Sequence, residues 1–125
     1  MPLHLSGQAE RLRIYTGESD RLNGRPLHEV ILEEARRAGM AGGTIIRAVA
    51  GFGANSRVHT AKILRLSEDL PMITEIVDTT PNIDAFLPVL DELMTEGLVV
   101  REPVRVLVYR AKNGEELPDD GGDAA

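Results

Sequence analysis

The residues best suited to chemistry gather between Gly51 and Lys62. This segment begins with two glycines and an aromatic ring and continues with three side chains that can carry positive charge; its candidate ligand-binding residues are Gly51, Phe52, Gly53, Arg57, His59 and Lys62. Backbone N–H groups left accessible by glycine, together with cations, suit an anionic ligand. We therefore predict that the segment, together with Arg47, binds a small anionic ligand; a solvated hairpin loop is the alternative.

Other kinds of chemistry find less support in the sequence. The run from Gly51 to Gly53 opens like a dinucleotide fingerprint, but Ser56 stands where the third glycine belongs. His4, His28 and His59 lie in separate segments without metal-ligand spacing, and His28 is expected at a helix surface. The chain has no cysteine, and no nucleophile elbow surrounds Ser56. We therefore expect no catalytic residues, no bound metal and no cofactor, and the protein is not expected to be an enzyme.

Length and charge set further limits on function. The chain has 125 residues, enough for one domain with a modest core, and 3% of them are aromatic. Residues 111–125 contain one Lys and five Asp or Glu, a sum of −4, so the other 110 residues carry −2 of the net −6. A nearly neutral domain with few rings is poorly suited to nucleic acid. Neither a signal peptide nor a membrane-spanning run is visible, so we expect a cytoplasmic protein.

Hydrophobic spacing predicts a set of strands and helices around this segment. Alternation of apolar and polar residues indicates strands. Apolar residues three and four apart, with Pro at the start and Gly at the end, indicate helices. The predicted elements are a strand at 11–15, a helix from Pro26 to Ala38, a strand at 44–50 inside the sheet, a strand at 71–78, a helix that Thr80 caps and Gly97 ends, an extended run at 98–101 and a strand at 104–109. Pro88 predicts a bend or a late start in the second helix. Ala61 to Leu66 is either a strand or a helical turn.

This order of elements is that of the ferredoxin-like α+β fold, βαββαβ. It predicts a four-stranded antiparallel sheet with two helices on one face. We expect residues 11–110 to form this domain. A flexible segment, 1–10, would precede it, and the acidic residues 111–125 would form a disordered tail.

Two helices on one face leave the other face of the sheet uncovered. Alternation places Arg11, Arg13 and Tyr15 of the first strand there. The third strand adds either Ile73, Glu75 and Val77 or Met72, Thr74 and Ile76, and the last adds Arg105, Leu107 and Tyr109. Such a mixed face is either solvated or a contact between subunits. We favour a contact with closed rotational symmetry, because exposed apolar patches usually mark interfaces.

Several runs of the sequence resemble an uncharacterised PII-like family, domain of unknown function 190, which is related to the PII nitrogen-regulatory proteins. The matching runs are Leu12-Arg-Ile-Tyr-Thr-Gly-Glu18, Pro26-Leu27, Ala38-Gly-Met-Ala-Gly-Gly-Thr44, Val49-Ala-Gly-Phe-Gly-Ala54, His59-Thr60, Leu66-Ser-Glu-Asp-Leu-Pro71 and Ile76-Val-Asp78. Together they span about residues 11–110. The resemblance implies a ferredoxin-like fold and a homotrimer.

The resemblance also implies a signalling role. Residues 51–62 would correspond to the long loop with which PII proteins touch partners, and a nucleotide would bind beside its base in the cleft between subunits. A membrane channel or transporter, such as a fluoride channel, is the implied partner. The alternative is a trimer that binds divalent metal, like the cation-tolerance proteins, through His59 with Glu18, Glu68 or Asp69.

Overall fold

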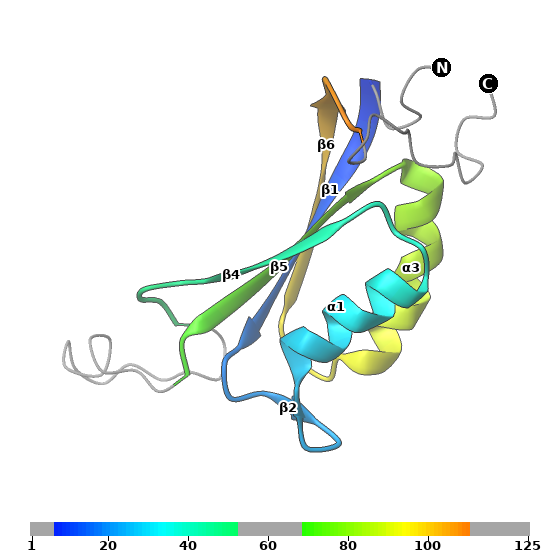
Figure 1. The fold of residues 1–125 in the computed structure, drawn as a ribbon. Coiled ribbons are helices and arrows are strands. Elements are labelled where there is room, and N and C mark those ends of the chain that lie inside the picture. The colour runs from blue at the N-terminus through cyan, green and yellow to red at the C-terminus, as the bar shows by residue number, and fades with distance from the viewer. Residues whose placement is uncertain (1–6, 53–68, 111–125) are drawn as a thin grey trace.

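The structure, a computed structural model, describes residues 7–52 and 69–110. In chain order these residues form β1 (Gly7–Gly17), β2 (Arg21–Leu22), β3 (Arg25–Pro26), α1 (Leu27–Arg37), β4 (Gly43–Arg47), β5 (Pro71–Asp78), α3 (Thr80–Leu93) and β6 (Leu98–Val106). Within this part of the chain one antiparallel sheet has the order β4-β5-β1-β6, and β2 and β3 form a short hairpin. Helices α1 and α3 lie side by side on the same face of the sheet (Figure 1). The predicted ferredoxin-like fold is confirmed.

The two central strands owe their orientation to alternating side chains. Along β5, every second residue from Met72 to Asp78 is buried, while the residues between are half-buried. In β1, Leu12 and Ile14 are fully buried beside the same face. A shift by one residue would expose this whole apolar set, so the alternation fixes the register of the pair, in which Leu12 faces Ile76.

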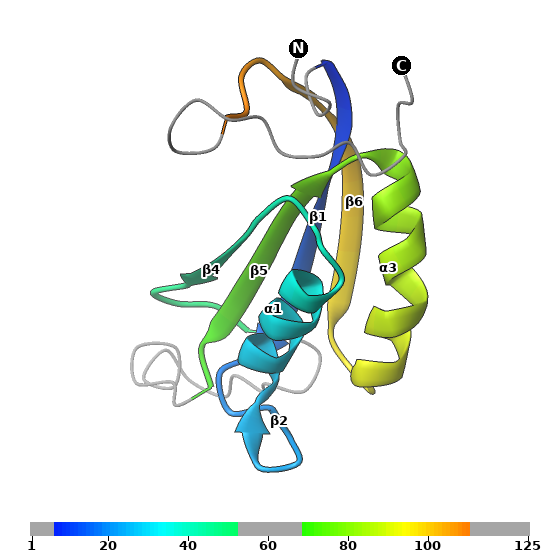
Figure 2. The same ribbon diagram turned by 45° about the vertical axis from the view of Figure 1, so that its right-hand side comes forward.

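The core fills the layer between the sheet and the two helices. Apolar side chains of β1 and β5 meet those of α1 and α3 there; the buried cluster is Leu12, Ile14, Leu27, Ile31, Ala35, Ile76, Ile83, Phe86 and Leu90. Figure 2 shows both helices covering the sheet from one side. The opposite face is left without cover by the described residues.

Helix α1 agrees with its predicted bounds, but one of its residues does not lie where the sequence indicated. Pro26 precedes the first turn, and Gly39, with φ at +80°, follows the last. His28 is buried rather than exposed at the surface. The first turn of the helix is thus buried at both Leu27 and His28.

Helix α3 begins one residue earlier than predicted. The cap is Thr79, not Thr80, because the Thr79 side chain accepts a hydrogen bond from the Asn82 amide. The helix then runs through Pro88 without a late start. Proline at this place removes one backbone donor, and the buried side chains of Ile83, Phe86 and Leu90 hold the helix against the sheet on both sides of it.

The two edge strands correct two further predictions, and the inner strand β1 begins earlier than the predicted strand. β4 ends at Arg47 and lies at an edge with most of its residues exposed, whereas the sequence placed a longer strand inside the sheet. β6 is one continuous strand that ends at Val106, so Leu107 and Tyr109 of the predicted last strand lie beyond it. β1 begins at Gly7, within the segment expected to be flexible. Ala61 to Leu66 falls outside the described residues.

Among the described residues, no helix is long and apolar enough to cross a membrane.

Candidate functional site

The uncovered face of the sheet carries three cross-strand rows. Directly paired residues point to the same side, so the strand registers define each row. The first is apolar and contains Ile46, Ile73, Tyr15 and Leu98. Of the two alternatives left open for β5, the face takes Ile73, Glu75 and Val77, because Met72, Thr74 and Ile76 are buried under the helices.

The other two rows are held by ion pairs. Arg13 lies between Glu75 and Val100, and its Nε donates to Glu75 Oε2 at 2.7 Å. This hydrogen bond, followed by a second with Tyr15, raises the pKa of Arg13. Arg11 pairs with Glu102 across β1 and β6 at 2.5 Å. The charges on this face are therefore paired within the chain, and the apolar row is what remains for other contacts.

A pocket of about 620 Å³ opens at the end of the apolar row. Its floor contains Tyr15, Ile73 and Leu98, and its sides come from two connections: the start of the β4–β5 connection and the turn between α3 and β6. The lining residues are Tyr15, Thr16, Gly17, Asp20, Ala48, Ala50, Gly51, Phe52, Asp69, Pro71, Ile73, Glu96, Gly97 and Leu98. Apolar and aromatic walls with a few polar groups are typical of small-molecule sites.

Gly97 allows the turn between α3 and β6 to approach β1 closely. A Cβ at this position would lie 2.7 Å from the Tyr15 carbonyl oxygen and 2.5 Å from Met94 Cε. Its φ of +123° also lies in a region that other residues rarely adopt. Gly97 therefore brings one wall of the pocket against Tyr15.

Two carboxylates fix the opposite wall. Asp20 Oδ2 accepts a hydrogen bond from the Gly17 amide at 2.8 Å, and Asp69 Oδ1 accepts one from the Ser19 amide at 2.9 Å. The Glu18 amide also donates to the Leu70 carbonyl at 2.8 Å. These hydrogen bonds join the end of β1 to the residues just before β5, so they hold the backbone on this side of the pocket in place.

The structure brings two of the predicted ligand-binding residues into this pocket, Gly51 and Phe52. The Phe52 side chain is 68% exposed. Arg47 does not join them: it pairs in the sheet with buried Met72, so it points to the helix side, and it forms an ion pair with Glu18 at 3.0 Å. Gly53, Arg57, His59 and Lys62 lie outside the described residues.

The sequence did not single out Leu98, Gly97 or Tyr15 as ligand-binding residues. They come together because β1 and β6 pair with Tyr15 opposite Leu98. Gly97 was interpreted only as a helix stop. The alternation of both strands is visible in the sequence, but the register that brings these residues together depends on tertiary packing.

The described lining contains no Lys or Arg, so positive charge for an anion would have to come from elsewhere. The metal alternative gains no support in the described residues, which hold no group of three or more potential ligands. Of its proposed acids, Glu18 pairs with Arg47 and Asp69 caps Ser19, while His59 and Glu68 lie outside the described part of the chain.

Solved structures with the same arrangement of elements are PII-like proteins. A protein from Thermus thermophilus assigned to PII-like signalling superposes with a TM-score of 0.53 at 21% identity, covering 86% of this chain and 94% of that chain. CPII from Thiomonas intermedia, bound to ADP and bicarbonate, gives a TM-score of 0.50 at 19% identity, covering 79% and 88%. The fold is therefore that of the PII-like proteins.

Residues 9–106 match the family DUF190 (Uncharacterized ACR, COG1993). A UPF0166 protein of Aquifex aeolicus is 35% identical over 98 residues, 77% of this chain and 90% of that protein. A UPF0166 protein of Methanocaldococcus jannaschii is 35% identical over 94 residues, 74% and 86% of the two chains. This chain belongs to the DUF190 family, as its sequence motifs predict.

Proposed function

We propose that this protein is a PII-like regulator that binds a small anionic ligand, an adenine nucleotide by preference, in the pocket lined by Tyr15, Phe52 and Leu98. The observation that carries the proposal is the pocket itself, at the root of the β4–β5 connection on the uncovered sheet face. The nucleotide-bound CPII structures, which share the fold, support the choice of ligand class.

The described walls suit the base of a nucleotide better than its phosphates. Tyr15 and Phe52 offer rings, and Ile73 and Leu98 offer aliphatic surface. A purine stacks on such surfaces, whereas phosphates need cations or free N–H groups. We propose that Arg57, His59 and Lys62, which follow Phe52 in the sequence, supply the charge for the phosphates.

Assembly belongs to the same proposal. The apolar row, which forms the pocket floor at one end and reaches Ile46 at the other, is partly exposed in the isolated chain, with Leu98 at 56% and Ile46 at 40%. Burying this row against other copies would remove apolar surface from water and place a second chain beside the pocket. We propose a homotrimer in which the ligand lies between subunits.

Ligand binding would be reported through residues 51–62. A ligand that contacts Phe52 and the residues after it would change the population of conformations of this segment, which alters the surface that it offers to a partner. A membrane channel or transporter, of the fluoride-channel kind, is the partner that we propose. In this scheme the protein regulates and does not catalyse.

Isothermal titration calorimetry tests the ligand directly. ADP, AMP, ATP and a cyclic dinucleotide are titrated into the full chain, and at least one is expected to bind with a Kd on the order of micromolar. Phe52→Ala should weaken that binding at least about tenfold, since a base stacked on a ring gains roughly 1–3 kcal/mol. Phe52 is largely exposed, so its removal should leave the fold intact.

Val49→Ala is the matched control, because Val49 is also exposed but does not line the pocket. It should bind the nucleotide as the wild type does. The ligand proposal fails if none of the four nucleotides binds below millimolar concentration. It also fails if Phe52→Ala and wild type bind equally well.

A further inference from the structure

A second hollow lies between α3 and β6 and borders the ligand pocket at Glu96 and Gly97, which line both. It has a volume of about 740 Å³ and an apolar floor made by Leu87, Pro88, Leu90, Met94 and Val99. These residues come from the later turns of α3 and the start of β6. We call this hollow the α3–β6 groove.

The groove exists because the helix layer does not reach the edge of the sheet. Helix α1 contacts β4 and β5, whereas α3 contacts β1. On the helix side of the sheet, Val99 of β6 lies opposite Ile14 of β1. Ile14 is fully buried, while Val99 is 37% exposed. The edge strand β6 is therefore partly exposed beside α3.

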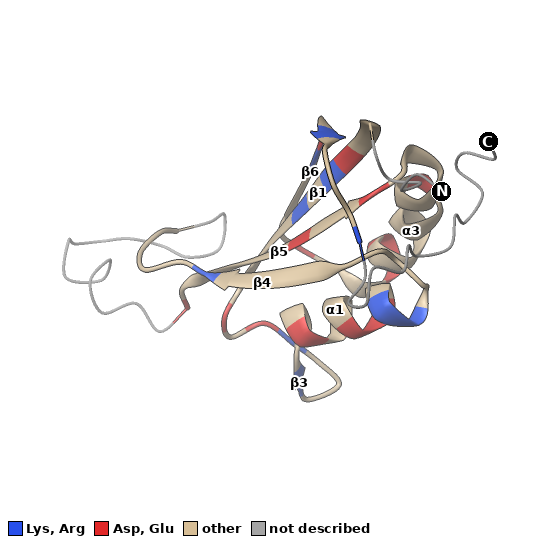
Figure 3. Ribbon diagram, turned by 45° about the horizontal axis from the view of Figure 1, so that its top comes forward, with Lys and Arg blue, Asp and Glu red and all other residues tan. Residues whose placement is uncertain are grey.

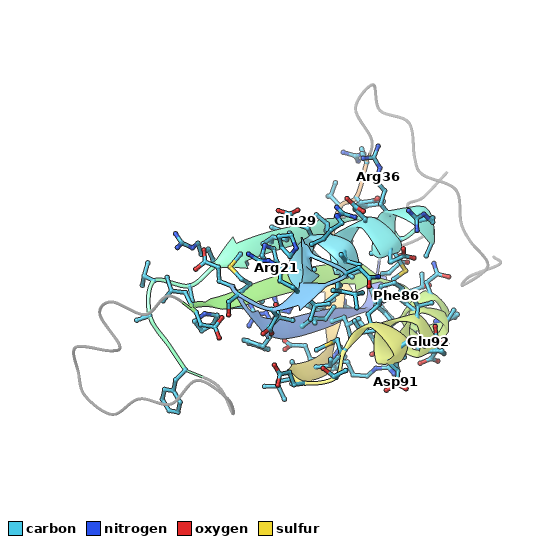
Figure 4. All side chains as sticks on the ribbon, turned by 90° about the horizontal axis from the view of Figure 1, so that it is seen from below. Arg21, Glu29, Arg36, Phe86, Asp91 and Glu92 are labelled. Carbon is cyan, nitrogen blue, oxygen red and sulfur yellow. The ribbon has the colours of Figure 1, made fainter. Side chains whose placement is uncertain are left out.

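Charge on the rim of the groove has one sign. Its ionisable lining residues are Asp84, Asp91 and Glu96, and α3 contains no Lys or Arg. In Figure 3, α3 carries red segments and no blue ones. Asp84 is paired with Arg101 at 2.9 Å, but Asp91 forms no ion pair with any described residue. Figure 4 shows Asp91 on the outer side of α3, whereas Phe86 points toward the interior.

We propose that the α3–β6 groove docks a basic amphipathic helix of a partner protein. Leu87, Leu90 and Met94 follow one another at helical spacing along the floor, which suits apolar side chains three and four apart on the docked helix. Lys or Arg on the flanks of that helix would meet Asp91 and its neighbours. This surface includes neither Gly51 nor Phe52 and goes beyond the proposed ligand site.

Two parts of the chain are poor occupants of the groove. Residues 111–125 carry a net −4, so the acidic rim would repel them. In a second copy, α1 and α3 both bury their apolar faces in their own core. A partner with apolar and basic side chains complements both the apolar floor and the acidic rim of the groove.

The probe is a synthetic amphipathic peptide of Leu, Ala and Lys, about 16 residues long so that it can form a helix. Its binding to the full chain is followed by fluorescence anisotropy and by amide chemical shifts. The test variant is Asp91→Lys and the matched control is Glu29→Lys, because both change an exposed acidic residue of a helix and alter the net charge equally. Asp91→Lys should weaken binding about tenfold, while Glu29→Lys should stay within about twofold of wild type.

In support of the proposal, shifts should concentrate in α3 and the start of β6, and a peptide with Glu in place of Lys should not bind. Three outcomes would overturn it. The first is an equal loss of peptide affinity in both variants, which would mean that the net charge of the protein alone determines binding. The second is undiminished binding of a peptide with Ser in place of Leu. The third is a change of assembly mass on Asp91→Lys, which would assign the groove to another copy of the chain.

Discussion

The Asp78 carboxylate joins three parts of the chain. Asp78 is 1% exposed at the end of β5. Its Oδ2 accepts from the Ala41 amide at 2.8 Å, and its Oδ1 accepts from the Thr79 amide at 2.7 Å and from Asn82 Nδ2 at 2.9 Å. One side chain thus holds the turn before β4 and the start of α3 against the central sheet.

Asp78→Ala should lower the free energy of unfolding by about 2–4 kcal/mol, because it leaves backbone donors without partners in a buried place. Urea unfolding followed by circular dichroism measures the change. Asp91→Ala, at an exposed position without an ion pair among the described residues, should stay within about 0.5 kcal/mol of wild type. Equal stability of the two variants would show that Asp78 is not an anchor.

Gly97 is a second residue whose substitution should be costly. A methyl group there would meet the Tyr15 carbonyl and Met94, and φ is +123°. Gly97→Ala should therefore destabilise the fold by about 2 kcal/mol or more, and Gly42→Ala, which meets nothing within 4 Å, should be neutral or slightly stabilising. Thermal unfolding of the pair measures the difference. Similar melting temperatures would contradict the close approach at Gly97.

Among the elements, β1, β6 and α3 meet at one charged cluster. Arg101 of β6 donates to Glu10 of β1 at 2.5 and 3.0 Å and pairs with Asp84 of α3. Glu10 also accepts from Thr80 at 2.8 Å. The bond from Arg101, and after it the one from Thr80, lowers the pKa of Glu10 below its ordinary value of 4.5. Glu10 therefore stabilises the fold in its ionised form.

The sign of the pH effect follows from this lowered pKa. The contribution of Glu10 should be complete above the unfolded-state pKa near 4.5 and be lost as the pH falls through the lower folded-state pKa. Glu10→Gln should be less stable than wild type near neutral pH, and the gap should close as the pH falls below the lowered folded-state pKa of Glu10. Urea unfolding across this range tests it. Glu92→Gln should follow wild type, and a gap independent of pH would contradict the role of Glu10.

The sequence predicted the elements whose pattern is set by burial on one side. In β1 and β5 the alternation is regular, and in α1 the helical spacing is bounded by Pro26 and Gly39, so their types and faces were predicted correctly. β4 was placed inside the sheet because its residues are apolar on both faces. β4 instead lies at an edge, where Ile46 is exposed and Ile45 is half-buried.

The candidate site was predictable only where its residues follow one another along the chain. Gly51 and Phe52 were identified from their neighbours in the sequence, and both line the pocket. Leu98 and Gly97 reach it through the register of β6 on β1, which local spacing does not contain. Arg47 was included for its proximity in sequence, yet the pleat of β4 turns it to the other side of the sheet.

For the molecule as a whole, the uncovered sheet face is the surface through which we propose that copies of the chain assemble. Its apolar row ends at the edge strand β4 with Ile46, which does not line the ligand pocket. Ile46→Glu should weaken assembly, since it places a charge among apolar side chains at the proposed interface. Ala85→Glu, on the exposed side of α3, is the control and should assemble as wild type does. Mass photometry compares them, and intact assembly of Ile46→Glu would argue against this interface.

Sedimentation equilibrium of the wild-type chain at micromolar concentration without ligand is the most direct test of a subunit contact over the open face. A mass three times the 13.6 kDa of one chain is expected, because the row from Ile46 to Leu98 would then be buried between copies. A mass of 13.6 kDa, unchanged with concentration, would contradict it, and the ligand pocket would then have to function within a single chain.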